Sequence, residues 1–309
     1  MCGICGEIRW DGERASAARV EAMADAMAPR GPDGAGVLAR GPVAFGHRRL
    51  KIIDLTEASA QPFTDTALGL TIVFNGCIYN YPELRRELEG KGHRFASTGD
   101  TEVILKAWAE WGEEAIDRLL GMFAFAIHDR TTGETVLVRD RFGIKPFYIA
   151  EIPGGLRFAS TLPALLAAPD VDRTIDPIAL HHYMTWHAVV PAPRTMLKGV
   201  RKLPPATIRR IAADGTARDR VYWRPMFERS AAEENRSFEG WRDMTLEALR
   251  VAVRRRMVAD VPVGVLLSGG VDSSLIVGLL AEEGQEKLAT YSIGFEAAHG
   301  ESGDEFKYS

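Results

Sequence analysis

The sequence predicts stacked layers of β-sheet and α-helix, followed by the start of a parallel α/β domain. Runs typical of strands lie on both sides of two helical stretches between residues 43 and 152, an order that suggests sheet and helix layers. Prolines interrupt regular structure between residues 191 and 225. Beyond them, residues 261–295 read as one strand, loop, helix and strand, which is the repeating unit of a parallel sheet.

The length of the chain agrees with two domains. It has 309 residues, and a domain has roughly 150. With 46% apolar and 26% charged residues the chain can bury a sizeable core. The proline-rich stretch places the boundary within residues 210–235. We therefore expect a first domain over residues 1–220 and the start of a second over residues 221–309.

The first domain is expected to alternate between short strands and helices. Pro82 suits the first turn of a helix that Gly90 and Gly92 end, and Asp100 or Thr101 can cap the next helix. The expected elements are a strand at 6–10, a helix at 16–27, a Gly/Pro-rich loop at 29–36, β-rich stretches at 43–55 and 70–80, helices at 83–92 and 102–121, and strands at 122–129, 134–140 and 146–152.

The second domain begins with a helix after Ser237. The apolar run 261–267 then has the character of a buried parallel strand. A glycine- and serine-rich loop, a helix at 275–283 and a strand at 288–295 follow. Because two strands are too few for a parallel sheet, the second domain is expected to be incomplete.

Charge and hydropathy argue against nucleic-acid and membrane partners. The net charge is −4. Arg254, Arg255 and Arg256 stand together, but Glu247 and Asp260 are nearby, so a solvated helix face explains them. No apolar run reaches the ~18 residues that span a bilayer.

The cysteines are few. Cys2, Cys5 and Cys77 form an odd, sparse set without a signal peptide, which favours a reducing cytoplasm over a disulfide scaffold. Cys2 and Cys5 have the spacing of a metal-binding pair, but no second pair completes the site, and a metal is not expected there.

Cys2 has a second possible meaning. Cys2 is a small second residue, which permits removal of Met1, and that removal would leave a cysteine with a free α-amine. An α-amine has a pKa of about 8 and a thiol of about 8.5, so proton transfer between them costs little near neutral pH. On its own, a cysteine at position 2 is also compatible with no function.

The stretch Ser-Gly-Gly-Val-Asp-Ser-Ser, residues 268–274, points to phosphate binding. A Gly-rich loop between a strand and a helix exposes backbone N–H groups at a helix N-terminus, where anions are favoured. The serines add hydroxyl groups, and Asp272 is suited to Mg²⁺. The loop lacks the Gly-Lys-Ser/Thr ending of a Walker A motif. It resembles the pyrophosphate loop of ATP pyrophosphatases.

Taken together, the motifs resemble the glutamine-dependent asparagine synthetase family. The motifs are MCGI (1–4), RGPDG (30–34), GHRRLKIID (46–54), FNGCIYNY (74–81), TGDTEVIL (98–105), GMFAFAIHD (121–129), RDRFGIKPFY (139–148), RKLPPA (201–206) and SGGVDSS (268–274). The resemblance implies an α+β N-terminal-nucleophile sandwich with α-β-β-α layers, that of a class II glutaminase, and then the start of an α/β ATP-pyrophosphatase-like (adenine nucleotide α-hydrolase) domain.

The resemblance assigns roles in glutamine hydrolysis. Cys2 would attack the glutamine side-chain amide, and Asn75 with the N–H of Gly76 would form the oxyanion hole. Arg49 would bind the α-carboxylate and Asp100 the α-ammonium group. The implied glutamine-binding residues are Arg49, Leu50, Ile53, Asn75, Gly76, Cys77 and Asp100. Each has an ordinary alternative, such as a turn at Asn75 or a helix cap at Asp100. His47 lies in a matching motif but reads as structural.

The resemblance also implies an ATP site with Mg²⁺ held by Asp272. The implied ATP-binding residues are Leu266, Leu267, Ser268, Gly269, Gly270, Asp272, Ser273, Ser274 and Ile293. Ammonia released at Cys2 would travel through an internal channel to an acyl-adenylate, because water would otherwise compete for that ester. The family implies a cytoplasmic enzyme, and relatives often form homodimers.

The sequence does not decide which molecule accepts the ammonia. Relatives usually have Asn-Gly-Glu where this chain has Asn75, Gly76 and Cys77, so a carboxylate is replaced by a thiol. That stretch and the tail at 300–309 resemble a subfamily that amidates the dipeptide N-acetylglutaminylglutamine. Aspartate and this dipeptide are therefore both candidate acceptors.

Two other functions were considered. The chain could be a stand-alone N-terminal-nucleophile hydrolase, although the SGGVDSS loop argues against it. It could also be a non-catalytic regulatory module, against which the set of Cys2, Arg49, Asn75, Gly76 and Asp100 argues. Because the sequence stops at Ser309, we expect this chain to hydrolyse glutamine without completing amide synthesis.

Overall fold

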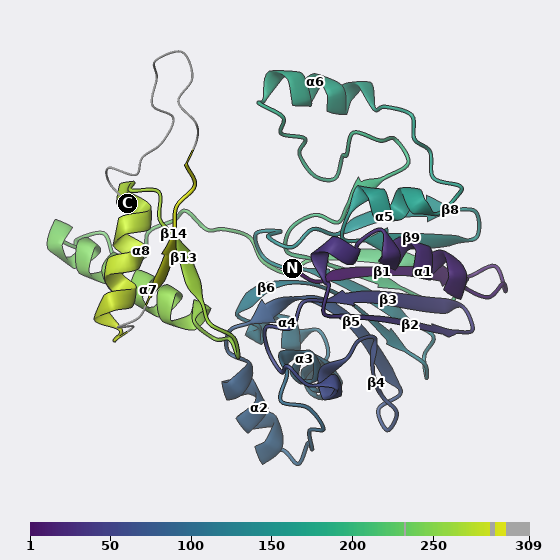
Figure 1. The fold of residues 1–309 in the computed structure, drawn as a ribbon, viewed down its shortest axis with the longest axis horizontal. Coiled ribbons are helices and arrows are strands. Elements are labelled where there is room, and N and C mark those ends of the chain that lie inside the picture. The colour runs from purple at the N-terminus through teal and green to yellow at the C-terminus, as the bar shows by residue number, and fades with distance from the viewer. Residues whose placement is uncertain (232, 285–287, 295–309) are drawn as a thin grey trace. The chain divides into compact units, whose positions relative to one another are not determined.

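A computed structural model describes residues 1–231, 233–284 and 288–294 (Figure 1). The chain divides into two units, Met1–Pro225 and Met226–Ser309. The division falls inside the proline-rich region in which the sequence placed a boundary. Each unit is described by itself below.

The first unit is built on two antiparallel sheets, each with six strands among the described residues. Sheet A has the order β10 (Arg201–Lys202), β8 (Tyr148–Ile152), β9 (Gly155–Ala159), β1 (Gly3–Arg9), β3 (Val43–Arg49), β2 (Gly34–Arg40). Sheet B has the order β12 (Ala217–Val221), β11 (Thr207–Ile211), β7 (Thr135–Arg139), β6 (Gly121–Asp129), β5 (Leu70–Ile78), β4 (Phe63–Asp65).

Alternating side chains hold the two sheets together. Side chains on a strand point to opposite faces in turn. On β5, Val73 joins the core between the sheets, whereas Ile72 and Phe74 point to the other face of sheet B. On sheet A, Ile4 and Phe45 face the same inner core. A second core on each outer face accounts for the strands that are apolar on both faces.

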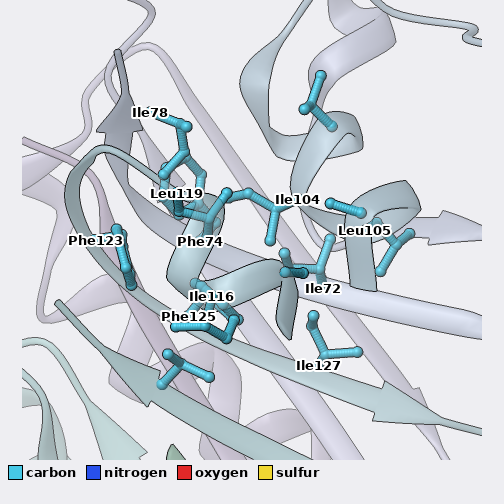
Figure 2. Close-up of a cluster of buried hydrophobic side chains, with 14 of the residues drawn as sticks. Ile72, Phe74, Ile78, Ile104, Leu105, Ile116, Leu119, Phe123, Phe125 and Ile127 are labelled. Carbon is cyan, nitrogen blue, oxygen red and sulfur yellow. The ribbon is translucent and has the colours of Figure 1, made fainter. Parts of the chain in front are cut away.

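Three helices cover the outer face of sheet B (Figures 1 and 2). They are α2 (Tyr81–Gly90), α3 (Asp100–Trp111) and α4 (Glu114–Arg118). Figure 2 shows Ile104 of α3 and Ile116 of α4 in one cluster with Phe74, Phe123 and Phe125 of the sheet. Full burial of such a side chain contributes about 1.5–3 kcal/mol. This core fixes α3, and with it Asp100, against the end of β5.

The outer face of sheet A is covered by α1 (Ala17–Asp25) and α5 (Leu162–Ala167). Val20 and Met23 of α1 pack with Cys5 of β1 in this third core. The order of layers is therefore helix, sheet, sheet, helix. The predicted α-β-β-α sandwich is confirmed for the first unit.

The second unit contains α7 (Phe238–Arg256), β13 (Gly264–Leu266), α8 (Val271–Glu282) and β14 (Ala289–Tyr291). The two strands pair in parallel, with Val265 opposite Thr290. Its core is small, with Val253, Leu279 and Leu280 as the buried residues. The predicted burial of the strand in 261–267 is wrong, because Leu266 is 70% exposed. A pair of strands with helices α7 and α8 is too little structure to cover it.

Several other elements differ from expectation. The helix expected at 102–121 is two helices, because Gly112, with φ +57°, ends α3 in the left-handed region. Gly99, and not Asp100 or Thr101, is the N-cap of α3. The helix expected at 275–283 begins four residues earlier, at Val271.

Some elements escaped the sequence analysis. The strands β2 and β9 and the helices α5 and α6 (Pro177–Thr185) were not predicted. The first of these strands lies at the edge of sheet A, and its residues are mostly exposed, so its sequence carries no strong apolar alternation. Short helices begin at Ala28 and Glu57. The C-terminal tail and the end of the strand expected at 288–295 lie outside the described residues.

Candidate active site

A cavity of about 250 Å³ opens around the N-terminus of the first unit. It is called the Cys2 cavity here. Its lining combines all the glutamine-binding residues expected from the sequence with further residues that were not expected. The lining residues are Met1, Cys2, Arg49, Leu50, Ile52, Ile53, Ser59, Gln61, Phe74, Asn75, Gly76, Cys77, Asp100, Thr101, Met122 and Lys145.

Cys2 is held at the cavity by the pairing of β1 with β3. Gly3 pairs with Arg48, which brings Cys2 beside the end of β3. The backbone N–H of Leu50 donates to Cys2 Sγ at 3.3 Å, and the thiol lies 3.6 Å from the carbonyl oxygen of Leu50. Arg30 Nε donates to the Cys2 carbonyl oxygen at 3.1 Å. Burial raises the pKa of the Cys2 thiol, while the Leu50 N–H and the α-amine oppose that rise.

The N-terminal amine lies at the same place. Burial lowers the pKa of the α-amine of Met1 below its usual value of 8.0. The amine and the thiol of the next residue interact electrostatically. A lowered pKa enlarges the neutral fraction of an amine, and the neutral form is the one that accepts a proton.

Asn75 offers an unused hydrogen-bond donor. It lies on β5, its residue is 1% exposed, and its Nδ2 has no hydrogen-bond partner among the described residues. A buried amide without a partner costs about 1–3 kcal/mol. An orphan donor of this kind on a cavity wall is suited to an oxygen that develops negative charge.

Gly76 has a steric reason to be glycine. A Cβ at this position would lie 2.2 Å from the carbonyl oxygen of Met122 and 2.9 Å from the Cα of Phe123. Both residues belong to β6, the strand beside β5. Glycine thus permits the close approach of the two strands at the cavity wall.

Arg49 is oriented by a loop. Its residue is 6% exposed, and its guanidinium donates to the carbonyl oxygens of Thr56, at 2.6 Å, and Asp54. The Asp54 carboxylate in turn accepts from Thr56 Oγ1 at 2.6 Å and Ser59 Oγ at 2.7 Å. A guanidinium has five N–H donors, so donors remain for a ligand after these two bonds.

Asp100 is the first residue of α3 and is also buried. Its Oδ2 accepts from the backbone N–H of Ile78 at 3.0 Å. Burial raises the pKa of Asp100 to about 7, against the effect of that hydrogen bond and of Arg49. A carboxylate in this state gains from a cationic ligand, because the ligand's charge would stabilise its ionised form.

Cys77 is not suited to act as a second nucleophile. It lines the cavity and is 8% exposed. Burial and then Asp100 raise the pKa of Cys77 to about 12, so it stays a neutral thiol. Leu50 and Ile53 supply apolar surface on the same wall.

Histidine takes no part in this cavity within the described residues. His47 is 1% exposed, and its Nε2 lies 3.2 Å from the carbonyl oxygen of Phe74. Burial lowers the pKa of His47 to about 3, so it stays neutral. Its interpretation as a structural residue agrees with this position.

Several polar residues at the cavity or beside it were not predicted from the sequence. Gln61 connects two elements, because its Nε2 donates to Thr101 Oγ1 at 3.2 Å and its Oε1 accepts from Phe74 N at 2.6 Å. Lys145 is buried and Arg30 is half-buried, and both lie beside the N-terminus. Both lie in motifs that carried the family resemblance, RGPDG and RDRFGIKPFY, and that was the available signal.

In the second unit, residues 268–270 lie between β13 and α8, and residues 271–274 form the first turn of α8. Gly269 has φ +78°, a left-handed conformation that favours glycine. The N-cap of α8, Gly270, caps the helix with no side chain, which leaves N–H groups of its first turn for a ligand. Ser268 Oγ and Ser273 Oγ lie 3.2 Å apart. These donors fit the phosphates of ATP.

Asp272 stands in the first turn of α8. Among the described residues no cluster of three or more His, Cys, Asp or Glu side chains could hold a metal ion. Mg²⁺ bound with nucleotides commonly takes one or two carboxylates and completes its shell with phosphates and water. A single Asp272 fits that pattern. Leu266 and Ile293, which were expected near the adenine and ribose, are exposed.

Comparisons with known proteins match the two units of the chain to two different families. Residues 1–223 match the family model described as glutamine amidotransferase domain, and residues 244–309 match that of asparagine synthase. Asparagine synthetase [glutamine-hydrolyzing] 3 of Bacillus subtilis is 35% identical over 96% of this chain and 48% of its own length. Asparagine synthetase [glutamine-hydrolyzing] 1 of the same organism is 40% identical, over 90% and 43%. The chain thus spans about half the length of these curated relatives.

A solved structure supports the fold. Glutamine phosphoribosylpyrophosphate amidotransferase from B. subtilis, complexed with ADP and GMP, superimposes with a TM-score of 0.53 at 16% identity, over 94% of this chain and 65% of its own. Among the described residues, no helix has the length and apolar character needed to cross a membrane.

Proposed function

Because the chain belongs to the glutamine amidotransferase domain family, we propose that its first unit releases ammonia from the side-chain amide of glutamine, with Cys2 as the nucleophile. One observation carries the proposal. The thiol of Cys2 and the unpartnered amide of Asn75 line one cavity at the chain's N-terminus. A nucleophile and a free donor for the oxyanion are the two groups that acyl transfer needs.

Removal of Met1 would give Cys2 the free amine. The amine then takes the thiol proton as Sγ bonds to the amide carbon, and Asn75 Nδ2 with Gly76 N–H would stabilise the oxyanion. The amine passes the proton to the leaving nitrogen, the C–N bond breaks and ammonia departs. Water then hydrolyses the γ-glutamyl thioester to glutamate.

The cavity holds charges suited to the α-amino acid end of glutamine. The remaining guanidinium donors of Arg49 would bind the carboxylate, and Asp100 the ammonium group. Leu50 and Ile53 would contact the methylene groups, and Cys77 would lie close to the ammonium site. With a neutral thiol at position 77, recognition of the ammonium group depends on Asp100.

We propose that the second unit begins a site that uses ATP to activate a carboxylate for amidation by this ammonia. Residues 268–274 would bind the phosphates, and Leu266, Leu267 and Ile293 the adenine and ribose. Asp272 would hold Mg²⁺, which neutralises phosphate charge. Either aspartate or N-acetylglutaminylglutamine would be the acceptor. The match of residues 244–309 to the asparagine synthase family supports this assignment. A cytoplasmic location and a homodimer belong to the same proposal.

Labelled glutamine tests the proposal. The full-length protein is incubated with ¹⁵N-amide glutamine, ATP and Mg²⁺, and with aspartate and N-acetylglutaminylglutamine in parallel. Mass spectrometry follows the label. We expect labelled ammonia in every reaction and labelled amide with one acceptor. Label in asparagine identifies aspartate as the acceptor, and label in the dipeptide amide identifies the dipeptide. Absence of labelled ammonia contradicts the glutaminase assignment.

A further inference from the structure

Lys145 is a buried cation that has no carboxylate partner in the part of the chain that the structure describes. Its residue is 4% exposed, and it lines the Cys2 cavity. Its Nζ lies 3.4 Å from Met1 Sδ, and no ion pair within 4.0 Å joins it to a carboxylate among the described residues. A buried ammonium with only a thioether beside it is costly. Removal of Met1 would take even that contact away.

The loop before Lys145 fixes its position. The Asp140 carboxylate accepts the backbone N–H groups of Ile144 and Lys145, each at 2.9 Å. Arg139 Nε donates to the carbonyl oxygen of Lys145 at 2.8 Å, and Arg139 Nη2 to that of Gly143 at 2.7 Å. Both backbone polar groups of Lys145 are therefore used. The structure holds the ammonium at the cavity wall, and a chance surface lysine would have no such support.

Groups around Cys2 act on its pKa in both directions. Burial has the largest effect and raises the pKa of the thiol, and Asp100 acts in the same direction, while the Leu50 N–H, the α-amine and Lys145 lower it. Burial lowers the pKa of the Met1 α-amine most, Arg30 and Lys145 lower it further, and Cys2 and Asp33 raise it.

Lys145 itself responds to the same groups. Burial lowers its pKa and Arg30 acts in the same direction, while Cys2, Cys77 and Asp140 raise it.

We propose that Lys145 is the positioning cation of the nucleophile: its ammonium, held at the cavity wall by the Arg139–Asp140 loop, favours the thiolate of Cys2 and the neutral form of the α-amine. The inference rests on the glutaminase function proposed above. Both effects act in the direction that the attack requires, because a thiolate attacks and a neutral amine accepts the proton. Lys145 acts through Cys2 and makes no bond to glutamine.

The substitution Lys145→Met tests the proposal, because it removes the charge and keeps an unbranched side chain. The full chain is used, after its intact mass has shown that Met1 is absent. The rate of alkylation of Cys2 by iodoacetamide is measured from pH 5 to 10, with the modified peptide identified by mass spectrometry. Glutamine turnover is measured over the same range. Lys202→Met is the matched control, since Lys202 lies away from the cavity and donates to the Val190 carbonyl oxygen.

The expected result is a shift of the alkylation profile to higher pH. A neighbouring opposite charge moves a pKa by about 1–3 units, so alkylation at pH 7 should fall roughly tenfold or more. The rates should converge above the thiol pKa, which a general loss of structure would not produce. We expect kcat to fall at pH 7 with little change in KM, and Lys202→Met to behave like the wild type.

Other outcomes overturn the proposal. An unchanged alkylation profile with a raised KM would show that Lys145 binds glutamine directly. An unchanged profile with unchanged turnover would show that its charge is irrelevant. Should Lys145→Met fail to fold, Lys145→Arg decides, because it keeps the charge: a profile like the wild type supports the proposal, and a profile shifted to higher pH contradicts it. A shifted alkylation profile in a protein that does not hydrolyse glutamine would contradict the glutaminase assignment, and it would leave the effect of Lys145 on Cys2 supported.

Discussion

The two candidate sites are built in opposite ways. The Cys2 cavity lies within the first unit, and its functional groups are mostly side chains, such as Asn75 and Asp100, that are at least nine-tenths buried. The loop at 268–274 lies in a unit with a small core, and several of its residues are exposed. Its ligand groups are largely backbone N–H groups. Single side-chain changes should therefore disable the first site far more than the second.

The largest effect is expected for Cys2→Ala. Removal of the nucleophile leaves only binding and the oxyanion donors, so glutamine turnover should fall by roughly 10⁴-fold or more. The protein should fold normally, because the hydrogen bonds of the Cys2 side chain within the described residues are the two long contacts to Leu50. Ammonia release from glutamine measures the loss, and amide formation from free ammonia in the full-length protein should persist. Turnover close to that of the wild type would show that Cys2 is not the nucleophile.

Asn75→Ala should have the second-largest effect on glutamine turnover. It removes the orphan donor assigned to the oxyanion, and such a loss lowers kcat by about 10²–10³-fold. KM should change little, because the bond is strong only in the transition state. The free protein should gain rather than lose stability, since Nδ2 has no partner among the described residues. A raised KM with an unchanged kcat would show that Asn75 binds the ground state instead.

Asp100→Asn should raise KM for glutamine by roughly 10- to 100-fold, because a charge-assisted hydrogen bond is worth about 1.5–3 kcal/mol. The effect should depend on pH. With its pKa raised to about 7, Asp100 in the free protein ionises only around neutral pH, so wild-type KM should fall as pH rises through 7. The variant should lack this dependence. A profile shared by both proteins would place the titrating group elsewhere.

The same substitution should stabilise the fold. The pKa of Asp100 rises from 3.8 to about 7 on folding, so the folded state favours the neutral acid. The resulting loss of stability is absent below pH 4, grows between pH 4 and 7 and is complete above 7. Asp100→Asn should therefore melt a few degrees above the wild type at pH 8 and close to it at pH 4. Equal melting temperatures at pH 8 would contradict the raised pKa.

The smallest effect is expected in the second unit, for Gly269→Ala. A left-handed residue with a Cβ costs about 1–2 kcal/mol, which should weaken ATP binding by roughly tenfold. Isothermal titration with ATP and Mg²⁺ measures it, and Gly278→Ala in the middle of α8, where a Cβ meets nothing within 4 Å, is the control. A loss of ATP affinity as large as the loss of glutamine turnover in Cys2→Ala would contradict the difference between the two sites.

The layers of the fold and the residues of the site could be predicted from the sequence to different extents. Alternation on β5 and β6 is strong because both faces of sheet B are buried, and both strands were predicted. Edge strand β2 escaped, because its exposed residues carry no apolar pattern.

The residues that line the cavity could be predicted from sequence motifs, but their geometry could not. That Arg49 binds carbonyls of its own loop, or that Asn75 Nδ2 stays unpartnered, depends on contacts between segments far apart in the chain. Lys145 lies in a quoted motif but acquires meaning only beside Met1 and Cys2, more than 140 residues away. Strand pairing creates that neighbourhood.

Trapping the thioester tests the central claim most directly. The full chain is mixed with glutamine and hydroxylamine, γ-glutamyl hydroxamate is quantified, and the intact mass of the same sample is recorded. The account predicts a chain that begins at Cys2, hydroxamate from the wild type and none from Cys2→Ala. Equal hydroxamate from both proteins, or an active enzyme that keeps Met1, would contradict the assignment of Cys2 and its free amine as the nucleophile and base.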